Sequence, residues 1–292
     1  MIMKNKYIGC QSELKNIKNE YDNFLKIHKK KKILCGKIQL EYYSGGKGKD
    51  TILFMPHISS LIPLEIIFRT IMDYGKCFKV IAPVLPDVGN IDELAESINT
   101  ILKEEKIDKV IVFGQSGAGI TAQIFFSRFY QKIKAMILVN TVTPKAKKKN
   151  MFTILFKVMP ECILKHFIKM QLKKYYKLKN IPNDFHPKIM FINYLLEENL
   201  KRCFSKKKFI EDLNLINMFN DENIQIKKTL QNWEGKILII TSEDDPLYED
   251  SKILSHLLPN SEIHIFKGEY GHLTPSIKSN ELKQVIQNFL LK

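Results

Sequence analysis

The sequence predicts an α/β fold in which a mostly parallel central sheet is covered by helices on both faces and carries an inserted helical cap. Short continuous apolar runs recur along the chain, as in strands that are buried on both faces. Each run is followed by a segment whose apolar residues lie three and four positions apart, as in an amphipathic helix. One stretch of more than ninety residues breaks this alternation with helical periodicity alone. At 292 residues the chain is long enough to bury one large core.

Two elements are expected before the alternation begins. Residues 12–29 have apolar residues at helical spacing with polar residues between them, which predicts a leading amphipathic helix. Residues 33–43 turn at Cys35-Gly36 and then alternate apolar and polar, which predicts a hairpin. The glycine-rich stretch 44–48 that follows is expected to be flexible.

The central part of the fold is expected to consist of strands that alternate with helices. The strands are expected at residues 51–55, 78–82, 109–113, 135–139, 236–241 and 262–266. The helices between and after them are expected at residues 61–74, 91–105, 117–130, 248–258 and 280–291. This order predicts a parallel sheet, because such strands can be joined only by crossovers that lie on the faces of the sheet.

The interval 140–235 is too long for a crossover in a compact sheet and too apolar for a disordered segment. We therefore expect a helical cap at residues 145–230, inserted into a core formed by residues 1–144 and 231–292. The first part of the cap, residues 151–176, combines large apolar side chains with lysines. We expect this part to cover the pocket and to line it for an acyl chain.

The net charge of +15 is concentrated in the expected cap. Residues 145–210 hold seventeen Lys or Arg against four Asp or Glu. This excess has two interpretations: a lysine-rich face that attracts an anionic substrate or an anionic membrane surface, or a solvated surface without a partner. The chain has only three arginines. Since proteins that read nucleic acids rely on arginine, nucleic acid is not expected as a partner.

The cysteines and the N-terminal residues bear on the cellular compartment. Five cysteines are scattered through the chain without a CxxC pair, which indicates reduced thiols. The N-terminal residues lack the continuous apolar run of a signal peptide, and no segment approaches the roughly 20 apolar residues that a membrane span needs. These observations predict a cytoplasmic location.

The most informative motif is Gly114-Gln115-Ser116-Gly117-Ala118-Gly119, which lies between an expected strand and an expected helix. A serine at the tip of a glycine-flanked turn in this position is typical of a nucleophile elbow. The serine needs small neighbours because bulk on either side would collide with the adjacent strand and helix. A plain strand-to-helix turn and a phosphate-binding loop are the alternatives. The phosphate loop would need a lysine after the last glycine, and Ile120 stands there.

Three further segments make the chain resemble the α/β-hydrolase superfamily over about residues 33–291. Residues 80–89, with the sequence VIAPVLPDVG, are similar to the loop after the family's fourth strand. Residues 107–109 resemble the approach to the elbow, and residues 136–141 resemble the sixth strand, after which many members insert a lid. The resemblance implies an α/β-hydrolase fold and serine chemistry.

The resemblance also implies a catalytic triad in the order Ser, Asp, His. Ser116 is the expected nucleophile, and it needs a base because a serine hydroxyl is a weak nucleophile near neutral pH. His272, in the dipeptide Gly271-His272, matches the family's catalytic histidine. Asp245 follows the strand expected at residues 236–241 and matches the family's acid, with Asp244 as the alternative.

An oxyanion hole is implied by the same resemblance. It should use the backbone N–H of Gly117 and one from the loop after the strand expected at residues 51–55. Family members commonly have His-Gly in that loop, whereas this chain has Met55-Pro56-His57. Because proline has no N–H, the donor is assigned to His57. This proline, a Phe-Arg pair in the next helix and the lysine-rich cap also give a weaker likeness to the maspardin-like branch.

The sequence thus predicts a serine hydrolase that cleaves a carboxylic ester, thioester or amide of a small acyl substrate through an acyl-enzyme. Two alternatives stay open, namely a binding protein with the same fold but no catalysis, and a C–C bond hydrolase with the same triad. Neither a dinucleotide motif nor histidines at metal-ligand spacing occur, so no cofactor and no metal are expected.

Overall fold

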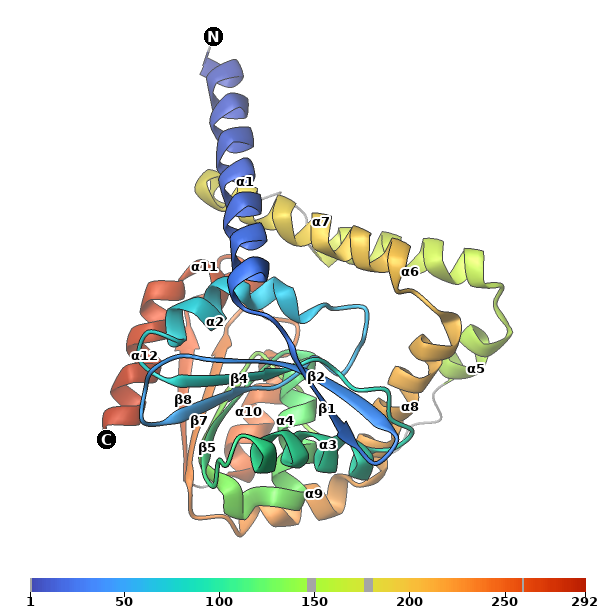
Figure 1. Cartoon of the computed structure of the whole chain (residues 1–292), viewed down its shortest axis with the longest axis vertical. Coiled ribbons are helices and arrows are strands. Elements are labelled where there is room, and N and C mark those ends of the chain that lie inside the picture. Colours follow the sequence, from blue (N-terminus) through green and yellow to red (C-terminus); the bar gives the residue numbers. More distant parts are fainter. Residues whose placement is uncertain (1, 146–150, 176–180, 259) are drawn as a thin grey trace.

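A computed structural model describes residues 2–145, 151–175, 181–258 and 260–292. Their strands form a single mixed sheet with helices on both sides (Figure 1). The strands are β1 (Lys31–Cys35), β2 (Ile38–Gly45), β3 (Thr51–Phe54), β4 (Lys79–Pro83), β5 (Val110–Gln115), β6 (Ile133–Val139), β7 (Lys236–Ser242) and β8 (Ser261–Phe266).

The strand order places the end of β5 in the middle of the sheet. Across the sheet the order is β1-β2-β4-β3-β5-β6-β7-β8. The hairpin β1–β2 is antiparallel, as is the pairing of β2 with β4, and every later pairing is parallel. The carboxyl ends of β3, β5, β6 and β7 therefore meet at one edge, where ligand sites form in such sheets.

Alternate residues of the buried strands pack into two separate apolar cores, one on each face of the sheet. In β5, Val110 and Val112 face one core, and Ile111 and Phe113 face the other. Helices α3 (Ile91–Glu104), α4 (Gly117–Phe129) and α9 (Asn223–Gln231) cover the first core. Helices α1 (Ile2–Ile27), α2 (Phe68–Tyr74) and α12 (Ser279–Leu291) cover the second. The predicted α/β sheet with helices on both faces is thereby confirmed.

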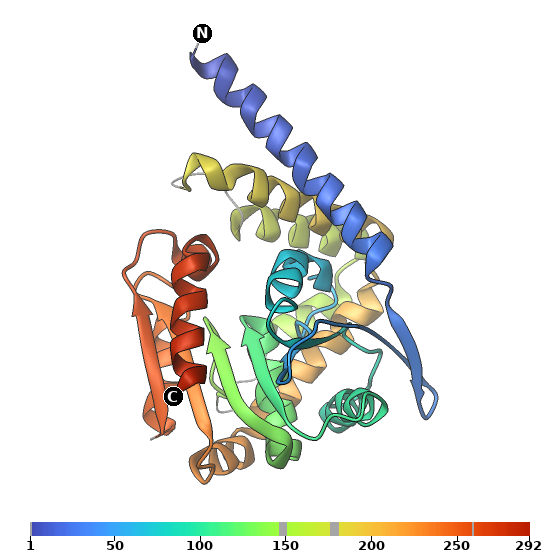
Figure 2. The ribbon, with the colours of Figure 1, turned by 60° about the vertical axis from the view of Figure 1, so that its left-hand side comes forward.

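Several element boundaries differ from the sequence expectation. α1 begins at Ile2, ten residues before the helix expected at residues 12–29, and extends beyond the rest of the fold (Figure 2). The helix expected at residues 61–74 is a 3-10 turn η1 (Leu64–Ile67) followed by α2, because Pro63 disfavours helical backbone in the residue before it. β5 continues through Gln115, directly to the elbow serine.

The described parts of the chain between β6 and β7 contain helices and no strand, as expected. These helices are α5 (Met151–Val158), α6 (Glu161–Tyr175), η3 (Asn183–Phe185), α7 (His186–Arg202), α8 (Lys206–Asp221) and α9. Leu164, Ile168 and Leu200 join α6 to α7 in an apolar cluster separate from both cores. By contrast, α9 packs on α4 in the first core. The cap boundaries at residues 145 and 230 stay a prediction, and the lysine run 147–149 lies outside the described residues.

The remaining elements are short or lie near the C-terminus. The elements are α10 (Tyr248–Leu257), η4 (Gly271–Leu273) and α11 (Thr274–Ile277), besides the short turn η2 (Tyr130–Lys132) after α4. All five cysteines are free thiols. Among the described helices, none combines the length and the apolar character that crossing a bilayer requires.

Candidate active site

Ser116 occupies a strained turn between β5 and α4. Its backbone angles are φ 56° and ψ −126°, a region that side-chain-bearing residues rarely adopt. Two hydrogen bonds hold this geometry. The Ser116 N–H donates to the Val139 carbonyl at 2.9 Å, and the Thr141 hydroxyl donates to the Ser116 carbonyl at 2.8 Å. The chain thus maintains a strained serine at the end of a central strand, which is the geometry of a nucleophile elbow.

The residues around Ser116 must be small because neighbouring atoms lie very close to them. A Cβ on Gly114 would lie 2.8 Å from the Ala118 carbonyl oxygen, so a larger residue there would push α4 away from β5. A Cβ on Gly117 would lie 2.3 Å from Nε2 of His57. The imidazole of His57 is therefore packed directly on the elbow, at the residue after the serine.

Asp245 and His272 form a hydrogen-bonded pair at the same edge of the sheet. Asp245 follows β7, and Oδ2 of its carboxylate accepts a hydrogen bond from Nδ1–H of His272 at 2.7 Å. The Asp245 side chain is 0% exposed, and its Oδ1 accepts from the Leu247 N–H at 2.6 Å. The Asn140 amide donates to the His272 carbonyl at 3.0 Å and fixes the histidine loop. The pair leaves Nε2 as the nitrogen of His272 that is not committed to the carboxylate.

Asp244, the alternative acid, lies elsewhere. Its side chain is exposed, and its Oδ2 accepts a hydrogen bond from the Gly271 N–H at 2.7 Å. Of the two neighbouring carboxylates, the structure brings only Asp245 to the imidazole of His272. Asp244 instead supports the turn that carries the histidine.

His57 lies in the loop after β3 in a defined tautomer. The Ser59 N–H donates to Nδ1 of His57 at 3.0 Å. Because neutral imidazole has one acceptor and one donor nitrogen, the ring proton is on Nε2. Burial, with a contribution from His272, lowers the pKa of His57 to about 4. The ring is therefore neutral at pH 7 and directs an N–H towards the elbow.

We expect the free energy of unfolding to decrease between pH 6.5 and pH 4 by about 3 kcal/mol more in the wild type than in His57→Asn. In the unfolded chain histidine titrates near 6.5, whereas in the fold His57 titrates near 4. Below pH 6.5 the unfolded state binds a proton that the folded state does not, so acid favours unfolding. Urea unfolding at several pH values measures the difference. Parallel pH profiles for the two proteins would contradict the assignment.

We expect Gly117→Ala to destabilise the protein by about 1–3 kcal/mol, because the added methyl group collides with the ring of His57. The same substitution in a His57→Ala background should cost much less, since the ring is gone. A double-mutant cycle by urea unfolding measures this coupling. An equal cost of Gly117→Ala in both backgrounds would mean that the ring does not pack on the elbow.

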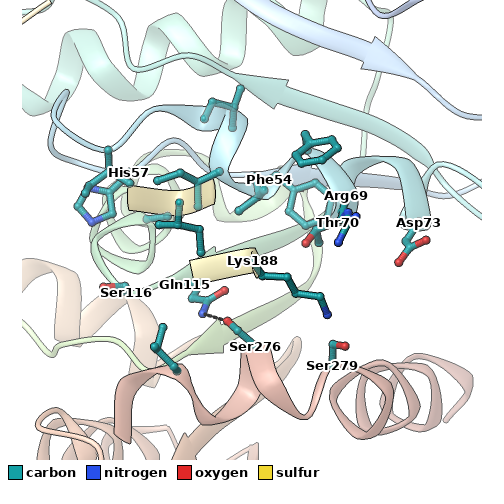
Figure 3. A pocket seen from close by; sticks show the side chains of 18 of the residues that line it. Phe54, His57, Arg69, Thr70, Asp73, Gln115, Ser116, Lys188, Ser276 and Ser279 are labelled. Atoms are coloured by element: carbon teal, nitrogen blue, oxygen red, sulfur yellow. Dashed lines mark hydrogen bonds between the residues drawn. The ribbon is translucent and has the colours of Figure 1, made fainter. Parts of the chain in front are cut away.

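A cavity of about 340 Å³ opens beside the elbow, and Ser116, His57 and His272 all line it. Most of the remaining lining is apolar. It includes Phe54 of β3, Phe113 of β5, Ile189 and Phe191 of α7, and Ile17 of α1. Figure 3 shows Ser116 and His57 on one side of the cavity, with Arg69 and Asp73 on the opposite side. The candidate nucleophile thus lies at one end of a long apolar space.

The expected cover of this cavity by residues 151–176 is wrong for the part of that segment whose side chains the structure describes. The cavity wall receives its residues from η3 and α7 instead, from Phe185 to Ile192. The apolar side chains of α5 and α6 are used elsewhere, since Phe156 and Ile168 pack into the cluster shared with α7 and α8. Residue 176 itself lies outside the described residues.

Sequence reasoning missed the charged and polar side chains of the cavity wall. They are Arg69 and Asp73 of α2, Lys188 of α7, Lys283 of α12, and the hydrogen-bonded pair Gln115 and Ser276. No sequence motif links these positions, which only the tertiary fold brings together. Among the described side chains, no group of three or more His, Cys, Asp or Glu is arranged to hold a metal ion.

Comparison with known proteins places the fold in a family. The alpha/beta hydrolase fold family matches residues 73–274, which is more than half of the chain. The chain belongs to the alpha/beta hydrolase fold family. This match covers Ser116, Asp245 and His272, whereas α1 and the hairpin β1–β2 lie outside it. No curated protein matches the sequence.

Solved structures of other alpha/beta hydrolases are similar over most of the chain. One is Est816, described as an N-acyl homoserine lactone degrading enzyme, with 16% identity, a TM-score of 0.65, and coverage of 89% of this chain and 100% of the other. A bacterial membrane phospholipase A has 16% identity and a TM-score of 0.67, with coverage of 97% and 92%. The 2-hydroxy-6-oxo-6-phenylhexa-2,4-dienoate hydrolase of Rhodococcus sp. strain RHA1 has 14% identity and a TM-score of 0.69, with coverage of 90% and 98%. At these identities the likeness establishes the shared fold.

Proposed function

We propose that this protein is a serine hydrolase that cleaves a carboxylic ester, thioester or amide through an acyl-enzyme. Ser116 is the nucleophile, His272 the general base and acid, and Asp245 the orienting carboxylate. The observation that carries the proposal is the hydrogen bond between the buried carboxylate of Asp245 and His272. This histidine lines the same cavity as the strained Ser116. These groups are the parts that acyl transfer to a serine requires.

The reaction follows from the positions of these groups. The Ser116 Oγ attacks the carbonyl carbon, and its proton passes to Nε2 of His272. The resulting imidazolium is stabilised by the Asp245 carboxylate 2.7 Å from Nδ1. As the tetrahedral intermediate collapses, His272 returns the proton to the departing alcohol, thiol or amine. Water then attacks the acyl-enzyme by the same route, releasing the carboxylic acid and regenerating Ser116.

In this proposal the oxyanion is held by the backbone N–H groups of Gly117 and His57. Gly117 starts α4, so its N–H lies at the positive end of a helix. The loop that carries His57 is tied to the elbow, because the Ile58 N–H donates to the Gly117 carbonyl at 3.4 Å. The Nε2–H of the neutral His57 ring, packed on Gly117, supplies a third donor beside the reacting carbonyl. Because Pro56 has no N–H, two of these three donors belong to His57, the residue that follows it.

The solved neighbours agree with chemistry at a carbonyl carbon. They include a lactone-degrading enzyme, a phospholipase and a hydrolase of a dienoate. All of these reactions need a nucleophile and a polarised carbonyl, which supports a hydrolytic role on the same scaffold. A cytoplasmic location is proposed with this role, supported by the five free cysteines.

A fluorophosphonate probe tests the proposal directly, because it reacts with serines that are activated by a neighbouring base. We expect the purified protein to be labelled, and peptide mass spectrometry to locate the label on Ser116. A panel of short-chain and medium-chain esters, thioesters and amides then identifies the bond that is cleaved. Absence of labelling together with absence of turnover across the panel would favour a binding protein.

A further inference from the structure

Charged side chains from three helices meet at the end of the cavity away from Ser116. Arg69 and Asp73 lie on α2, Lys188 on α7 and Lys283 on α12, and all four line the cavity. In Figure 3 the Lys188 side chain extends across the cavity, with its amine directed away from Ser116 and towards Ser279. The cavity therefore joins a nucleophile at one end, through an apolar middle, to a cluster with an excess of positive charge.

The charges of this cluster are neutralised by carboxylates except at Lys188. Lys283 forms an ion pair with Asp73, and Arg69 pairs with Glu20 of α1 at 2.7 Å. Among the residues that the structure describes, Lys188 forms no ion pair with a carboxylate. Its amine instead lies over the ring of Phe185, 4.1 Å from the ring centre. One ammonium group in the wall thus has no described carboxylate within ion-pair distance, although Asp184 and Glu13 are near enough to act on its charge.

Lys188 is also held in an environment that disfavours an unpaired charge. It is half-buried, and its position is fixed because the adjacent Ile189 is fully buried in the fold. Burial lowers the pKa of Lys188 and the positive charges of Arg69 and Lys283 lower it further, while the carboxylates of Asp184 and Glu13, beyond ion-pair distance, offset part of this effect. Removing an ammonium from water without a counter-ion costs free energy, which an anionic ligand group would offset. The hydroxyls of Thr70 and Ser279 also line this end and can donate to such a group.

We propose that this end of the cavity binds a carboxylate at the far end of the substrate's acyl chain, with Lys188 as its principal partner. The preferred substrate is then an ester or thioester of a dicarboxylic acid that keeps one carboxylate free. The apolar middle of the cavity receives the methylene chain, and the carbonyl to be attacked lies at Ser116. This specificity rests on the proposed hydrolase function, whereas the binding of a dicarboxylate does not.

The kinetic test uses two matched series of 4-methylumbelliferyl monoesters. In one series the acyl group ends in a carboxylate, as in hexanedioic and octanedioic acid. In the other the terminal carboxylate is replaced by a primary amide of nearly the same shape. We expect the wild type to favour the carboxylate series in kcat/KM by about tenfold or more, as for hydrogen bonds between charged groups. The preference should decrease as the salt concentration rises.

The variants separate Lys188 from the general positive charge of the chain. Lys188→Gln should reduce the preference to about one, and Lys188→Arg should restore much of it. Lys201→Gln is the matched control, because Lys201 lies on the same helix but is exposed and pairs with Glu198. It should leave the preference unchanged. An equal preference in the wild type and Lys188→Gln would overturn the proposal.

A binding measurement separates this proposal from the catalytic one. Titration of hexanedioate into the Ser116→Ala variant by calorimetry should give binding that a second change, Lys188→Gln, weakens about tenfold. Hexanediamide, which has nearly the same shape but no carboxylate, should bind far more weakly than hexanedioate. Lysine-dependent binding without turnover of any ester would sink the hydrolase and keep the carboxylate site. Ester turnover without lysine-dependent binding would overturn the carboxylate site and support the hydrolase.

Discussion

We expect Ser116→Ala to abolish fluorophosphonate labelling and to reduce turnover by on the order of 10⁴-fold to 10⁶-fold. The substitution removes only the oxygen that attacks the carbonyl. It leaves the backbone bonds of Ser116 to Val139 and Thr141, which hold the elbow. The measurements are the rate of ester hydrolysis and in-gel detection of the probe. Unchanged labelling of the variant would show that another residue reacts.

The folded state provides the control for this result. Alanine fits the space of serine, so the midpoint of thermal unfolding should change by only a few degrees. Ser127→Ala is a matched variant, because its hydroxyl bonds only within α4 and its neighbour Arg128, away from the cavity. It should keep both labelling and turnover. A loss of activity in both variants would indicate a damaged fold rather than a missing nucleophile.

The sheet could be predicted from the sequence because its signals are local. Each buried strand is a short apolar run followed by a helix with a clear apolar face, and parallel pairing follows from that alternation. The ends of helices and strands could not be predicted to the residue where a turn sets them. The helix expected at residues 61–74 fails at Pro63, and the strand expected at residues 109–113 continues to Gln115 because the elbow begins only at Ser116.

The candidate catalytic residues could also be identified from the sequence, because each lies just after a strand in a short motif. Ser116 follows β5, and Asp245 follows β7. The resemblance favoured Asp245, but it left the adjacent Asp244 open as an alternative because the two carboxylates differ by only one position. The choice depends on which side chain turns inward after β7, which backbone geometry in the folded chain decides.

The cavity wall could not be predicted in the same way. Arg69, Lys188 and Lys283 are more than ninety residues apart in sequence, and they meet because α2, α7 and α12 pack on one side of the sheet. The sequence instead directed attention to residues 151–176, where lysines and large apolar residues are concentrated. The composition shows that lysines are concentrated in the cap. Only the packing shows that, of the described cap lysines, Lys188 lines the cavity.

We expect Asp245→Asn to reduce kcat/KM by about 10⁴-fold, and Asp244→Asn to reduce it by less than about tenfold. The Asp245 carboxylate accepts the Nδ1–H of His272 and is fully buried, so it fixes the tautomer and offsets the charge that the ring gains during the reaction. An amide in its place can present an NH₂ group to Nδ1 and favour the wrong tautomer. Asp244 only accepts the Gly271 N–H, and an asparagine oxygen can still accept that bond.

Steady-state kinetics on one ester at pH 7 compares these variants with His272→Ala, which should fall at least as far as Asp245→Asn. The side chains of a triad act as a unit, so the double variant Asp245→Asn/His272→Ala should be little worse than His272→Ala alone. Additive losses would instead mean that the two residues act separately. If Asp244→Asn proved the more damaging substitution, the carboxylate that orients His272 during catalysis would be Asp244, and the loop after β7 would have to rearrange when substrate binds.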